Sequence, residues 1–132
     1  MSLAAPRPRI GALLLASGWM RDVGLEGDGS GLARRVGAAA REIGARLAAV
    51  ADVTAPPVAA SAAEAARAAA AVLDAGCDCA LVVPLVWCED QVLRTAVQGL
   101  HGLPVVLGTL LGEPRLPPHL RFEDMLAGSG VV

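Results

Sequence analysis

The stretch from Cys79 to Gln91, CALVVPLVWCEDQ, constrains the fold of this chain most strongly. Its segment 80–86 is apolar, is too short to span a membrane, and lacks the alternation of a half-buried antiparallel strand. This pattern is typical of a central parallel strand that is buried on both faces. The aromatic and polar residues that follow are Trp87, Glu89, Asp90 and Gln91. Such residues suit the carboxyl end of a strand, where open α/β sheets bind their ligands.

Strand-like and helix-like segments alternate along the chain. The expected strands are 10–17, 49–53, 80–86 and 104–109, and the expected helices are 31–47, 61–75 and 89–98. Ser61 and Glu64 have the spacing of a capping box, and Gly76 and Gly99 are expected to end the second and third helices. The alternation predicts an α/β fold, a flavodoxin-like or Rossmann-like three-layer sandwich. Its sheet is expected to have four parallel strands in the order 2-1-3-4.

Length and composition predict one domain and exclude several classes of protein. A chain of 132 residues is long enough for a single hydrophobic core. The net charge of -2 gives no electrostatic footprint for nucleic acid. A membrane span and a signal peptide are not expected. Cys77, Cys79 and Cys88 are odd in number and lack the spacing of a disulfide framework, which favours a reduced, cytoplasmic setting.

A candidate site follows from the expected strand order. Trp19 and Trp87 come just after the first and third strands, which are neighbours where the order reverses. They are expected to wall a small-molecule pocket with four polar contacts. These contacts are Asp22, Glu89, Asp90 and Gln91. The alternative is that both tryptophans pack on neighbouring loops or on a second domain.

Other candidate sites do not meet the requirements of their chemistry. The glycine-rich segment 22–31 lacks the G-x-G-x-x-G pattern of a phosphate loop. Cys77-x-Cys79 has neither zinc nor redox spacing, and His101 and His119 have no partner at metal-ligand spacing. We therefore expect no catalytic residue and no metal site in this chain.

Four segments, in order along nearly the whole chain, resemble L-fucose/L-arabinose isomerase-like proteins. The first two are Trp19-x-x-Asp-Val-Gly-Leu25 and Val83-Pro-Leu-Val-Trp-Cys-Glu-Asp-Gln91. The other two are Leu103-Pro-Val-Val-Leu107 and the ending Asp124-Met-Leu-Ala-Gly-Ser-Gly-Val-Val132. Trp87, Asp90 and Gln91 match the family pattern most closely.

The resemblance implies a role in carbohydrate metabolism, as the N-terminal domain of an aldose–ketose isomerase. That family is an intramolecular oxidoreductase family that uses a divalent metal, usually manganese, held by later domains. This chain would shape the sugar pocket and pack between subunits of a homo-oligomer, without being catalytically complete alone. Residues 1–9 would be a loose arm, and 110–132 a proline-rich loop that leads to a missing next domain.

Two other functions stay open. One is a stand-alone small-molecule-binding or regulatory α/β module. The other is a small tetrapyrrole chelatase-like enzyme, which ranks lower. Such an enzyme needs a histidine after the first strand, where this chain has Ser17-Gly18-Trp19.

Overall fold

The computed structural model describes residues 5–18 and 32–108 of the chain. Strands and helices alternate in this part. They are β1 (Arg9–Leu15), α2 (Leu32–Ala48), β2 (Asp52–Thr54), α3 (Ala62–Asp74), β3 (Cys79–Pro84), α4 (Asp90–Gly99) and β4 (Val105–Leu107). The glycine-rich segment 22–31 and the whole carboxyl-terminal segment 110–132 lie outside the described residues.

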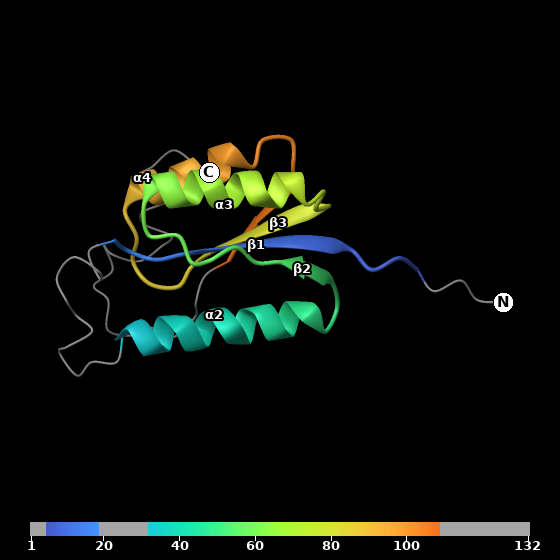
Figure 1. Cartoon of the computed structure of the whole chain (residues 1–132), viewed down its shortest axis with the longest axis horizontal. Coiled ribbons are helices and arrows are strands. Elements are labelled where there is room, and N and C mark those ends of the chain that lie inside the picture. Colours follow the sequence, from blue (N-terminus) through green and yellow to red (C-terminus); the bar gives the residue numbers. More distant parts are fainter. Residues whose placement is uncertain (1–4, 19–31, 109–132) are drawn as a thin grey trace.

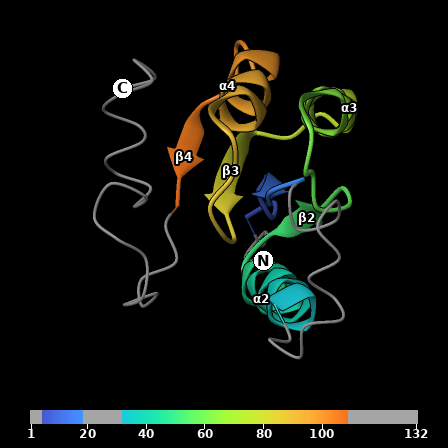
Figure 2. The same cartoon turned by 90° about the vertical axis from the view of Figure 1, so that its left-hand side faces the viewer.

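The strands form one parallel sheet in the order β2-β1-β3-β4, as the sequence predicted. Helix α2 covers one face of the sheet, and α3 and α4 lie side by side on the other (Figures 1 and 2). The three-layer arrangement is therefore confirmed. Among the described residues, no helix has the length and apolar character needed to cross a bilayer.

The central strands β1 and β3 are buried on both faces because each face has its own core. Leu13, Leu15 and Val82 pack beneath α3 and α4, whereas Leu14 and Val83 pack towards α2. Successive side chains of a strand point to opposite faces, so a strand covered on both sides needs an unbroken apolar run. The chain supplies two such runs, and they pair with each other in parallel.

Helix α3 begins at the predicted capping box, with one difference. The Glu64 backbone N–H donates to the Ser61 hydroxyl oxygen at 3.2 Å, as expected. The Glu64 carboxylate, however, accepts from the backbone N–H of Ala60 at 2.7 Å, one residue before the cap. The carboxylate therefore fixes the loop that enters the helix.

The two glycines expected to end helices have different roles. Gly76 has a positive φ of 66° and ends α3 as predicted. Gly99 is the last residue of α4, so this helix also ends where it was predicted to end, although Gly99 does not have a positive φ. A Cβ at Gly99 would lie 2.7 Å from the Cβ of Ala69. Gly99 is therefore explained by the close approach of α4 to α3.

The second strand begins later than predicted, at Asp52 rather than at residue 49. Helix α2 extends to Ala48, and the backbone N–H groups of Val50 and Ala51 both donate to the carbonyl of Leu47. These hydrogen bonds form the turn that ends α2, so the strand can begin only after this turn. Arg7 holds this turn: its guanidinium donates to the carbonyls of Ala48 and Ala51 and to the Asp52 carboxylate.

We predict that Val82→Asp will severely destabilise the domain. The Val82 side chain is 0% exposed between β1 and α3/α4, so the variant would bury a carboxylate with no partner provided for it. The penalty, several kcal/mol, is comparable with the whole stability of a small domain. Thermal unfolding followed by circular dichroism measures the effect.

The matched control is Val106→Asp on the edge strand β4, where the native valine is 57% exposed. We expect this variant to unfold close to the wild-type temperature. A folded Val82→Asp protein with an unchanged melting temperature would contradict the assignment of β3 as the central strand.

Candidate functional site

The carboxyl ends of β1 and β3 lie next to each other and position the candidate site. Leu15 of β1 is in register with Pro84, the last residue of β3, which has no backbone N–H. Beyond it, the Leu85 N–H donates to the Leu15 carbonyl at 2.8 Å. The residues that follow these two strands are therefore held close together.

Ser17 and Glu89, which are 72 residues apart in sequence, form a hydrogen bond at this end of the sheet. The Ser17 hydroxyl donates to Oε1 of Glu89 at 3.0 Å. Ser17 is only 2% exposed, the one polar residue among the buried side chains of the described segments. A buried serine paired with a carboxylate is a specific polar contact, because a polar group in a core needs a partner.

Glu89 is also the N-cap residue of α4, but its side chain does not cap the helix. Its backbone is extended, with φ -66° and ψ 141°, and its carbonyl accepts the N–H of Val92 at 2.9 Å. An N-cap side chain usually accepts an N–H from the first turn. Here the Glu89 side chain instead bonds to Ser17, so its position is set by the sheet.

The second carboxylate oxygen of Glu89, Oε2, is enclosed although other atoms of the side chain reach solvent. It has no hydrogen-bond partner among the described residues. Leaving a buried acceptor unsatisfied costs about 1–3 kcal/mol, and more for a charged group. A ligand that brings an O–H or N–H donor to Oε2 would recover this energy.

Cys88 lies beneath Glu89 in the core and is 1% exposed. Burial raises the pKa of its thiol to about 12, and the negative charges of Glu89 and Asp90 add to the rise. The thiol therefore stays protonated at neutral pH and does not act as a nucleophile. Cys77 is also buried, and Cys79 is partly exposed.

The other candidate residues of this segment face different surroundings. Trp87 is partly buried in the loop after β3, and Asp90 and Gln91 are exposed in the first turn of α4. The helix dipole stabilises a carboxylate in the first turn of a helix, so the presence of Asp90 at this position is explained without a ligand. Trp19 and Asp22, the remaining candidates, lie outside the described residues.

Metal-ligating side chains do not gather in the described part of the chain. No group of three or more histidine, cysteine, aspartate or glutamate residues there could hold a metal ion. His101 is exposed in the loop after α4, and His119 lies outside the described residues. The family resemblance places the manganese ligands in later domains.

Ser17 was not predicted as a site residue, although a signal for it exists. It is the first polar residue after the apolar run of the first strand. Parallel strands end at the same edge of a sheet, so a polar residue there is expected to lie near the polar segment after the third strand. Applying that rule to serine as well as to tryptophan would have identified the contact with Glu89.

No family model matches the chain, and neither the curated proteins nor the solved structures contain a significant match to it.

We predict that Cys88 will resist alkylation in the folded protein. Its thiol is enclosed and its pKa is raised to about 12, so at pH 8 almost none of it is the reactive thiolate. Iodoacetamide at pH 8, followed by peptide mass spectrometry, should modify the partly exposed Cys79 first and Cys88 only in denaturant.

The same shift predicts the pH dependence of stability. The unfolded thiol ionises at a lower pH than the folded one, so alkaline solution favours the unfolded chain. The free energy of unfolding should fall as the pH rises above the ordinary cysteine pKa towards 12, and the fall should be smaller in Cys88→Ala. For the alkylation experiment, modification of Cys88 as fast as that of Cys79 under native conditions would contradict the placement of Cys88 in the core.

Proposed function

We propose that this chain is the N-terminal domain of a sugar isomerase-like protein and forms one wall of its sugar pocket. The observation that supports the proposal is the Ser17–Glu89 pair, with its enclosed, unpartnered Oε2, at the carboxyl ends of β1 and β3. Ligands of open α/β sheets bind at this edge. The family resemblance of the segment 83–91 supports the choice of a sugar.

Sugars suit this arrangement chemically. A sugar presents hydroxyl groups, which can donate to a carboxylate oxygen, and C–H faces, which pack against aromatic rings. Glu89 supplies the acceptor, oriented by Ser17, and Trp87 supplies a partly buried ring in the same segment. In this proposal Asp90 and Gln91 contact solvent or a second subunit.

The isomerisation itself is assigned to other parts of the protein. The family resemblance places the manganese ligands in later domains, so in this proposal the chain binds and orients substrate and packs against further domains or subunits. Within this proposal the protein acts in the cytoplasm as a homo-oligomer. The free cysteines are consistent with a reducing compartment.

Intrinsic tryptophan fluorescence tests the proposal. The full chain is titrated with L-fucose and L-arabinose, and we expect a saturable change from millimolar binding. Glu89→Gln removes the charge while keeping the shape of the side chain, and Ser17→Ala removes the group that orients it. Each should weaken binding at least about tenfold, because a hydrogen bond to a charged group is worth about 1.5–3 kcal/mol and 1.4 kcal/mol corresponds to a factor of about ten.

Glu42→Gln is the matched control, because Glu42 is an exposed glutamate of α2 that pairs with Arg46 and not with a residue of the candidate site. It should bind as wild type does. Equal affinity in Glu89→Gln and wild type would show that Glu89 does not contact sugar. A signal that follows protein concentration rather than sugar, checked by sedimentation, would assign this surface to self-association instead.

A further inference from the structure

The connection between β2 and α3 leaves a gap in the edge of the sheet. The ladder between β1 and β2 ends at Gly11 and Thr54 and resumes only as an isolated bridge between Leu15 and Ala59. Pro56 and Pro57 lie in the interval, and proline has no backbone N–H to donate to a neighbouring strand. The chain therefore bows away from β1 at this point.

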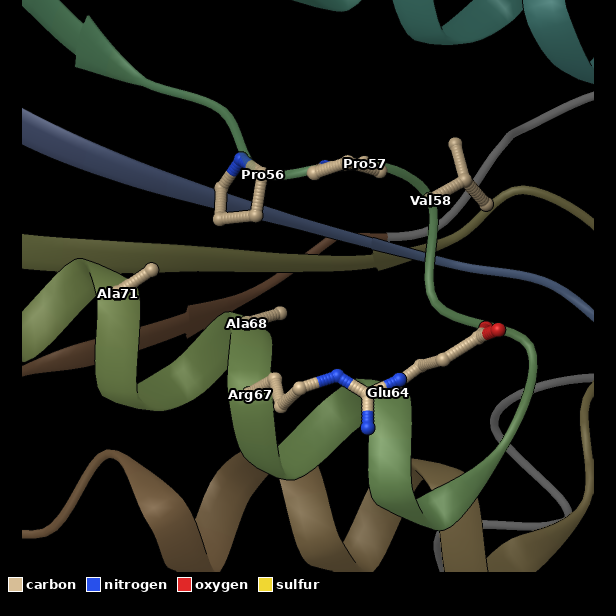
Figure 3. Close-up of a pocket in the computed structure, with 7 residues that line it drawn as sticks. All are labelled: Pro56, Pro57, Val58, Glu64, Arg67, Ala68 and Ala71. Carbon is tan, nitrogen blue, oxygen red and sulfur yellow. The ribbon is translucent and has the colours of Figure 1, made fainter.

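A cavity of about 310 Å³ lies between this connection and α3. The connection 56–58 forms one side, with the Pro56 ring directed towards α3 and the Val58 side chain directed away from it, and Ala68 and Ala71 of α3 form the other side (Figure 3). The alanines are too small to fill the space, and the fixed φ angles of the two prolines keep the connection from collapsing onto the helix. The volume is at the lower end of the range for ligand pockets, so the cavity suits a small molecule.

The cavity also carries an available positive charge. Arg67 of α3 lines it, is exposed, and makes no ion pair or hydrogen bond within the described segments. Glu64 lines the same cavity, but its carboxylate accepts from the backbone N–H of Ala60 and is directed to the loop before α3 (Figure 3). The group left to recognise a ligand is thus a guanidinium beside an apolar surface.

We propose that this cavity binds a small branched aliphatic carboxylate, at a site separate from the Ser17–Glu89 pair. The guanidinium of Arg67 binds the carboxylate, for which its planar fork of N–H donors is suited. The hydrocarbon part of the ligand is buried between the two prolines, Pro56 and Pro57, and the alanines of α3. Because Arg67 is exposed and its charge is screened by solvent, burial of the hydrocarbon supplies the larger share of the affinity.

Two-dimensional ¹H–¹⁵N NMR of the full chain, titrated with 4-methylpentanoate, tests the proposal. The neutral 4-methylpentanamide, of nearly the same shape, is titrated in parallel. We expect millimolar binding of the carboxylate, with amide shifts concentrated at Val58, Arg67, Ala68 and Ala71, and about tenfold weaker binding of the amide. Equal binding of the two would show that the site is only apolar and would overturn the proposal.

Two variants locate the ligand, each with a matched control. Arg67→Gln should weaken binding of the carboxylate to the level of the amide. Arg41→Gln should leave binding unchanged, because Arg41 is an exposed residue of α2, on the opposite face of the sheet from α3. Ala71→Leu should fill the cavity and abolish binding, whereas Ala66→Leu, exposed on α3 outside the cavity, should not. Both leucine variants keep high helix propensity, so α3 is retained.

Unchanged affinity in Arg67→Gln or in Ala71→Leu would contradict the proposal, as would shifts confined to the segment 85–91. These outcomes are independent of the sugar titrations, because none of the four substitutions alters Ser17, Trp87 or Glu89.

Discussion

The parallel pairing of β1 with β3 is the interaction on which the rest of this structure depends. Leu13 faces Val82 across the ladder, and Leu14 faces Val83, so each pair of neighbours contributes to a different core. Burying both faces of the same two strands requires helices on both sides. Connections from one parallel strand to the next must cross over the sheet, and they supply these helices. The three layers therefore follow from the need to bury both faces of these two strands.

The same pairing creates the candidate site. Two parallel strands that end in register bring the residues beyond them to one edge, and there the apolar runs give way to Ser17 and Glu89. Glu89 occupies a position where a side chain would normally cap α4, yet it bonds to the sheet. One of its oxygens is left enclosed without a partner among the described residues. Such a departure from local preference is characteristic of functional positions, where the structure forgoes some stability.

Most of the fold could be predicted because its signals are local or strongly periodic. The unbroken apolar run 80–86 identified the central strand, and Ser61 with Glu64 identified the start of α3. Other features depended on contacts that the sequence pattern does not show. Gly99 ends α4 as predicted, but the reason for a glycine at this position is the close approach of α4 to Ala69 of α3. Residue 49 was predicted to begin a strand, but it lies in the turn that ends α2, where the N–H groups of Val50 and Ala51 donate to the Leu47 carbonyl.

By itself, the sequence determined the fold class, the strand order and which segment supplies the polar residues at the carboxyl end of the third strand. These features follow from the spacing of apolar residues and from the rule that right-handed crossovers join parallel strands. Only the tertiary structure decided which polar side chains meet. Glu89, Asp90 and Gln91 are consecutive in sequence, yet within the described segments only Glu89 bonds to Ser17 beyond the end of β1, while Asp90 and Gln91 are exposed. The direction of each side chain depends on how α4 is placed against the sheet and α3, and the buried residues Val92, Leu93 and Ala96 set that placement.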